Sequence, residues 1–174
     1  MRPSGYLRWD LRQLAKAMHL TKDEVKRYFT DGRRVSFLVE RRIAREVLRG
    51  QVIDEGKPYD VIDAKQQKWE VRSVTKHGVY FCPSYMVGSQ RKFNGKGFEK
   101  KLKAISGYVI ADVASFPKVP YWIIPASVVA MWWENGELGS KTKVTRSKAI
   151  RLIKSITPRS RLRTTCLGKH GSGK

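Results

Sequence analysis

The chain has 174 residues, of which 41% are hydrophobic, and its formal net charge at pH 7 is +21. This length suits one folded domain with a small appended module, and the apolar content excludes a disordered basic tail. No apolar run approaches the roughly 20 residues that a membrane-spanning helix needs. Cys82 and Cys166 have no partners at zinc-ligand spacing, which excludes a zinc finger and a disulfide framework. The first ten residues lack the apolar stretch of a secretory signal, so we expect a cytoplasmic protein.

The positive charge is concentrated at the C-terminal end. No acidic residue follows Glu137, whereas the basic residues there are Lys141, Lys143, Arg146, Lys148, Arg151, Lys154, Arg159, Arg161, Arg163, Lys169 and Lys174. Such a run repels itself unless a polyanion lies nearby. Nucleic acid is therefore favoured as the partner over a membrane surface or an acidic protein.

Residues 1–35 predict a helical module. Asp10 with Gln13, and Thr21 with Glu24, are spaced as capping boxes at the starts of two short helices joined at His19-Leu20. The pair suits a helix-turn-helix that would present basic residues of its second helix to DNA, namely Lys22, Lys26 and Arg27. An amphipathic helical hairpin packed on the core is an equal alternative.

The next segment predicts a longer helix. Asp31 to Arg34 form a basic turn in which Arg33 and Arg34 could contact phosphates. Ser36 would cap a helix that Gly50 ends, and its apolar face would contain Phe37, Ile43, Ala44, Val47 and Leu48. Glu40 lies at the centre of that face. A buried acid needs an arginine partner, a proton or a metal ion, and all three remain open.

The rest of the chain alternates strands and helices. Strands are expected at 59–64, 69–75 and 79–82, followed by a basic loop (87–97) and a helix (98–105). A buried strand (108–113) precedes a strand at 120–125, whose terminal prolines suit a sheet edge. Residues 126–133 predict a helical or irregular lid, 147–156 a basic helix, and 157–174 a flexible basic tail.

Asp60 and Glu70 fall on the first two of these strands. A hairpin would bring the two carboxylates close together, where they repel each other unless a cation lies between them. Mg²⁺ takes one or two carboxylates together with substrate phosphates. In a chain of this charge, the pair indicates metal-dependent cleavage of a phosphodiester. The alternative is a pair of exposed hairpin charges balanced by Lys65, Lys68 and Arg72.

Pro58-Tyr59-Asp60 followed by Glu70-Val71-Arg72, in the order helix, three strands, helix, strand, resembles the PD-(D/E)XK nuclease superfamily. The resemblance covers about residues 36–125 and implies an α/β (mixed α+β) restriction-endonuclease-like core, taken here as 36–156. The arginine departs from the pattern, which has Glu-X-Lys.

The resemblance also implies roles for residues. Asp60 and Glu70 would bind Mg²⁺, with Glu40 as a third ligand from the helix before them, and Arg72 would stabilise charge on the phosphate. Because arginine stays protonated, water activation would fall to the metal or to Lys65, Lys68 or Lys76. Asp63 competes with Asp60, but alternation places the two on opposite faces of an ideal strand.

These expectations lead to a Mg²⁺-dependent endonuclease acting on double-stranded DNA, most similar to a type II restriction enzyme and, by analogy, a homodimer. Residues expected to contact DNA, besides those of the helical module and Arg33 and Arg34, are Gln90, Arg91, Lys92 and Lys96. A structure-selective repair or recombination nuclease would use the same site. A non-catalytic helix-turn-helix regulator and an RNA-binding protein are the alternatives from other classes.

Overall fold

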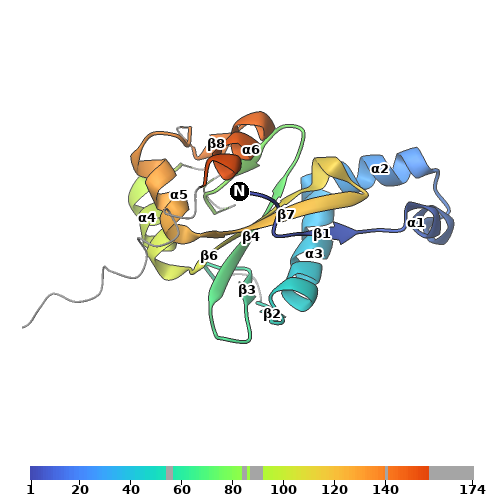
Figure 1. Ribbon diagram of the computed structural model, residues 1–174, viewed down its shortest axis with the longest axis horizontal. Coiled ribbons are helices and arrows are strands. Elements are labelled where there is room, and N and C mark those ends of the chain that lie inside the picture. Colours follow the sequence, from blue (N-terminus) through green and yellow to red (C-terminus); the bar gives the residue numbers. More distant parts are fainter. Residues whose placement is uncertain (54–56, 84–85, 87–91, 140, 157–174) are drawn as a thin grey trace, which may run out of the picture.

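A six-stranded mixed sheet lies at the centre of the computed structural model, which describes residues 1–53, 57–83, 86, 92–139 and 141–156 (Figure 1). The strand order is β1-β7-β6-β4-β3-β2, with β4 and β6 parallel and the other neighbours antiparallel. The strands are β1 (Gly5–Arg8), β2 (Gln51–Val52), β3 (Val61–Ile62), β4 (Lys68–Val74), β6 (Gly107–Asp112) and β7 (Lys118–Pro125). Two further strands, β5 (Val79–Tyr80) and β8 (Lys143–Val144), form a separate antiparallel pair. The predicted mixed α/β class is confirmed.

Helices cover both faces of the large sheet. They are α1 (Leu11–Met18), α2 (Lys22–Thr30), α3 (Gly32–Arg42), α4 (Gly95–Ala104), α5 (Ala126–Glu134) and α6 (Arg146–Ser155), with a π-helical turn η1 (Ile43–Val47) and a 3₁₀ turn η3 (Val113–Ser115). In Figure 1, α4, α5 and α6 gather together, whereas α3 lies apart beside β1. No helix in the described part of the chain is both long and apolar enough to cross a bilayer.

The central strand β6 divides the core into two layers because its side chains alternate in direction. Tyr108 and Ile110 pack with α4, α5 and α6, whereas Val109 and Ala111 pack with α2 and α3. All six residues of β6 are buried, as the apolar sequence predicted for a strand covered on both faces.

The long helix differs from its predicted form. It begins at Gly32 rather than Ser36, and Phe37 is 55% exposed instead of lying on the buried face. From Ile43 the helix widens into η1, where the Leu48 amide donates to the Ile43 carbonyl (2.9 Å). Gly50 was predicted to end it by its backbone freedom, but its role is steric, since a Cβ there would collide with the Ile62 carbonyl of β3.

Several predicted strands also need correction. The edge position predicted for 120–125 is wrong, because β7 pairs with both β1 and β6. The sequence reading missed β1, whose Tyr6 lies opposite Pro120. The β6–β7 register starts at Tyr121, so the missing N–H of Pro120 does not interrupt that ladder. The strand predicted at 59–64 is only Val61–Ile62, and the one at 79–82 pairs with β8.

Both predicted N-terminal helices form, and α2 has the complete Thr21–Glu24 capping box. On α1, Asp10 accepts from the Arg12 and Gln13 amides, which is only one half of the capping box predicted with Gln13. Val25 and Phe29 of α2 are buried in the layer beneath α3. Residues 126–134 are helical rather than irregular, and the predicted tail at 157–174 lies outside the described residues.

We expect Arg146→Ala to destabilise the protein by roughly 2–3 kcal/mol, because it removes the partner of a buried acid. Asp112, at the end of β6, has a side chain only 3% exposed and accepts from Arg146 Nε at 2.9 Å and Nη2 at 2.6 Å. Urea unfolding measures the loss. Adding Asp112→Asn should recover part of it, whereas equal destabilisation of the double variant would show that the charge is not the cause.

Candidate functional site

Strand β4 carries the centre of the site. Glu70 and Arg72 alternate with Val71, so both point to the α4 side of the sheet while Val71 packs in the opposite layer. Asp60 lies immediately before β3, and its Oδ2 accepts a hydrogen bond from the Val71 amide at 2.8 Å. The hairpin thus holds Asp60 beside Glu70, as the sequence predicted.

The Glu70 carboxylate is 2% exposed and contacts two cations. Its Oε1 forms ion pairs with Arg72 Nη2 and with Lys101 Nζ of α4, the latter at 2.5 Å. Its Oε2 is buried and has no hydrogen-bond partner. Burial raises the pKa of Glu70, and the charges of Arg72 and Lys101 oppose that rise.

Arg72 is fixed by backbone as well as by acids. Its Nη1 donates to the Val71 carbonyl (3.3 Å), and its Nη2 donates to the Cys82 carbonyl (3.2 Å). Arg72 Nη1 also lies 4.0 Å from Asp60 Oδ2. The guanidinium therefore bridges the two acids and is held rigidly enough to stabilise negative charge at a defined point.

Sequence reasoning missed Lys101. Its side chain is 4% exposed, whereas Lys65, Lys68 and Lys76, the lysines considered for water activation, are all exposed. Burial, followed by the like charge of Arg72, lowers the pKa of Lys101. A signal was available, because Phe98, Lys101, Leu102 and Ile105 form one helical face and a lysine there interrupts an apolar pattern.

Glu40, on α3, is coupled to the site because the charges of Asp60, Glu70 and Arg72 affect its pKa. Burial raises the pKa of Glu40 to about 7, and the negative charges of Asp60 and Glu70 add to this rise while Arg72 and Arg41 oppose it. With Asp60 and Glu70 ionised, the two carboxylates balance Arg72 and Lys101. A charged Glu40 would then be an excess negative charge, so the neutral form is favoured.

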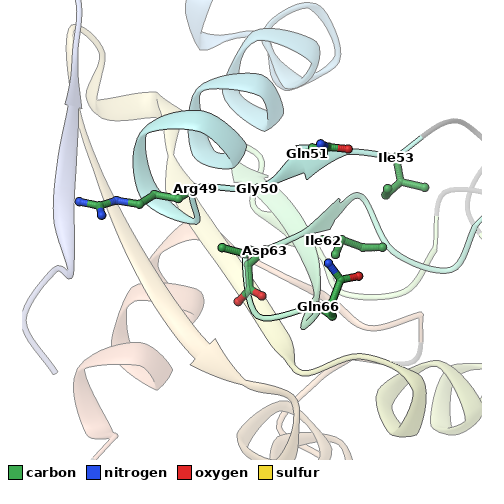
Figure 2. A pocket seen from close by; sticks show the side chains of 8 residues that line it. Arg49, Gly50, Gln51, Ile53, Ile62, Asp63 and Gln66 are labelled. Atoms are coloured by element: carbon green, nitrogen blue, oxygen red, sulfur yellow. The ribbon is translucent and has the colours of Figure 1, made fainter.

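The competing aspartate, Asp63, is used by the β3–β4 turn. Its Oδ1 accepts from the amides of Lys65 and Gln67 (both 2.8 Å), and its Oδ2 accepts from Trp69 Nε1 (2.9 Å). Asp63 also lines a pocket of about 310 Å³ with Arg49, Gly50, Gln51, Ile53, Ile62, Ala64 and Gln66. Figure 2 shows that the Arg49 side chain extends away from the other labelled residues. Neither Glu70 nor the four charged residues around it, Asp60, Arg72, Lys101 and Glu40, line this pocket.

The residues predicted to contact DNA are dispersed. Lys22, Lys26 and Arg27 are exposed on α2, and Lys92 and Lys96 are exposed before and at the start of α4. Arg34 is exposed and lies 3.3 Å from Asp31. Arg33 lies within α3, whereas Gln90 and Arg91 fall outside the described residues.

The oxygen donors around Glu70 are the carboxylates of Asp60 and of Glu70 itself. Within the described ranges, no group of three or more His, Cys, Asp and Glu side chains is placed to hold one. Two carboxylates suffice for Mg²⁺ when water and phosphate complete its coordination. The buried, unpartnered Oε2 of Glu70 beside Asp60 is an oxygen donor of that kind.

Comparison with known proteins gives no relative. No protein-family model matches the chain, and no curated protein or solved structure is significantly similar to it.

We expect Glu40→Gln to remove a pH dependence of stability. Between its ordinary pKa of 4.5 and the folded value of about 7, native Glu40 keeps a proton that the unfolded chain releases. The contribution of Glu40 to the free energy of unfolding therefore falls as pH rises through this window, by at most roughly 3 kcal/mol. Urea unfolding should show the variant and the wild type nearly equal at about pH 4.5 and the variant more stable at about pH 8. Parallel curves for the two proteins would contradict the assignment.

Proposed function

We propose that the protein is a Mg²⁺-dependent endonuclease that hydrolyses phosphodiester bonds in DNA. The observation that carries the proposal is the buried Glu70 carboxylate, whose free Oε2 lies in a cluster with Asp60, Arg72 and Lys101. Clusters of buried acids and cations with displaced pKa values are typical of catalytic sites. The net charge of +21 favours a polyanionic substrate.

Asp60 and Glu70 are the residues that would hold the metal. Glu40, the third ligand that the resemblance implies, is not grouped with them at ligand distance among the described residues, so it would act through its charge. Bound there, Mg²⁺ would polarise the scissile phosphate and lower the pKa of a water molecule. Glu40 would still couple metal affinity to pH, since a bound cation and the ionised form of Glu40 favour each other through their charges.

The two cations have different capacities. Arg72 remains charged and would stabilise the negative charge that builds on the phosphate. Lys101 has a lowered pKa, so once it has released its proton it could accept one from the attacking water, and while charged it could orient that water. Lys101 thus offers the proton-accepting group that an arginine on β4 does not.

A type II restriction enzyme acting as a homodimer is the first form of the proposal, because cutting both strands of a duplex calls for two such sites. A structure-selective repair or recombination nuclease would use the same residues.

A second candidate is a DNA-binding protein without catalytic activity, in which the α1–α2 hairpin would contact the DNA bases. One observation favours it. Glu70 is already neutralised by two cations, and no third acid lies at ligand distance among the described residues.

The decisive measurement is Mg²⁺-dependent nicking of supercoiled plasmid, with sequencing of the product ends. The wild type should cut, and Asp60→Asn should not. Glu70→Ala alone would leave Arg72 and Lys101 uncompensated and risks unfolding, so the matched variant is Glu70→Gln with Lys101→Met, which keeps the charge balance. Binding of plasmid without cutting under any divalent metal would establish the second candidate.

Lys101→Gln should lower kcat at about pH 8 by roughly 100- to 1,000-fold, the range for loss of a general acid or base. Glu70 keeps Arg72 as its partner in this variant, so folding should survive, as circular dichroism can check. Lys103→Gln on the exposed side of α4 is the matched control. Equal rates for the two variants would remove Lys101 from the proposed chemistry.

A further inference from the structure

The separate β5–β8 strand pair is joined to the site around Glu70 by Phe81 and Cys82, the two residues that follow β5. Both are buried, at 0% and 1% exposed. The Phe81 amide donates to the Thr142 carbonyl (3.3 Å), which extends the β5–β8 pairing by one residue. The Cys82 carbonyl accepts from Arg72 Nη2 (3.2 Å), so this strand pair gives the site a direct backbone contact.

All four backbone polar groups of the Phe81–Cys82 dipeptide have partners. Besides the two contacts above, the Cys82 amide donates to the Thr142 hydroxyl (2.8 Å), and the Phe81 carbonyl accepts from the Tyr108 hydroxyl (3.1 Å). Thr142 thus binds the dipeptide twice, while β6 and β4 each provide one side chain. Because buried backbone groups need such partners, a shift of the dipeptide would leave at least one of them unsatisfied.

The orientation of Arg72 depends on this dipeptide. Arg72 Nε is buried and has no hydrogen-bond partner in the described part of the chain, so the guanidinium is oriented through Nη1 and Nη2. The Val71 carbonyl and the Glu70 carboxylate, which contact these nitrogens, belong to the same strand as Arg72. Among the described residues, the Cys82 carbonyl is the one hydrogen-bond acceptor of Arg72 outside β4. Movement of that carbonyl would therefore turn the guanidinium.

Thr142 adopts a backbone conformation that its own side chain disfavours. Its φ is 55°, in the left-handed region, where a β-branched residue is an outlier. The residue is nevertheless 0% exposed, and both its carbonyl and its hydroxyl bind the dipeptide. Strained residues of this kind persist where the surrounding structure fixes them, and they cluster at functional sites.

We propose that Thr142 is a positioning residue for Arg72, and that it acts by holding the Phe81–Cys82 backbone so that the Cys82 carbonyl orients the guanidinium. The inference rests on the proposed function, in which Arg72 stabilises the negative charge that builds on the phosphate. It gives the β5–β8 strand pair a part in that chemistry, since such stabilisation requires the cation to be held in a defined place.

The first test is plasmid nicking by Thr142→Val with Mg²⁺. Valine has nearly the shape of threonine, so the strained backbone is kept while the Cys82 amide loses its acceptor. We expect kcat to fall roughly 10- to 100-fold with little change in KM, because Arg72 would act on charge that develops in the transition state. Thr142→Ser keeps the hydroxyl and should recover most of the rate.

Thr145→Val is the matched control. The Thr145 hydroxyl caps α6 by accepting from the Lys148 amide (3.3 Å), so the variant also loses one hydrogen bond from a backbone amide to a threonine hydroxyl. It should cut at the wild-type rate. Equal rates for Thr142→Val and Thr145→Val would overturn the inference.

Tyr108→Phe serves if Thr142→Val does not fold. It removes the other hydroxyl that holds the dipeptide, so kcat should fall in the same way. A wild-type rate for folded Tyr108→Phe would also overturn the inference.

Nuclear magnetic resonance of the ¹⁵N-labelled protein tests the inference without cleavage. A guanidinium that is held through Nη1 and Nη2 should give separate resonances for these two nitrogens, identified by their absence from Arg72→Lys. Thr142→Val should broaden or merge the two resonances, and Thr145→Val should leave them unchanged. Unaltered resonances in Thr142→Val would overturn the inference whether or not the wild type cuts.

The two measurements separate this inference from the proposed function. A wild type that cuts, with Thr142→Val equally active, refutes the positioning role alone. A wild type that does not cut, with Arg72 resonances that change in Thr142→Val, refutes the nuclease and supports the positioning of Arg72.

Discussion

The arrangement of the site depends on one interaction, the burial of the Glu70 carboxylate between Arg72 of its own strand and Lys101 of α4. A carboxylate that is 2% exposed loses most of its hydration, and only close cations can compensate for that loss. The contact therefore links β4 to the helix that covers it, and it fixes the direction of both cations. The same strand also fixes the position of Asp60, because the Asp60 carboxylate accepts a hydrogen bond from the Val71 amide, between Glu70 and Arg72.

The charge balance of this cluster explains the behaviour of Glu40. Two carboxylates and two cations leave no net positive charge to stabilise another anion, and burial disfavours the charged form further. A divalent cation would change that balance by two charges and would favour ionised Glu40. Protonation of Glu40 would thus oppose the binding of a metal at this place, and any metal affinity of the site would depend on pH near neutrality.

The sequence predicted what depends on local pattern. The helices α1 and α2, the strands β4, β6 and β7, and the proximity of Asp60 and Glu70 follow from alternation, capping residues and a short hairpin. It did not predict what depends on tertiary packing. Lys101 reaches Glu70 from a helix that lies 31 residues further along the chain. The strand β1 is only four residues long, and its absence from the prediction made β7 an apparent edge. Phe37 looked like a core residue because periodicity alone does not show which side of α3 meets the sheet.

The two forms of the proposed nuclease differ in how they would recognise DNA. A restriction enzyme reads base edges through hydrogen bonds in the major groove, which requires polar side chains held at defined positions. Lys22, Lys26 and Arg27 are exposed on α2 and are one candidate for that role. They lie on another helix than the residues around Glu70, so recognition of sequence and the proposed chemistry would be carried by different elements of the fold.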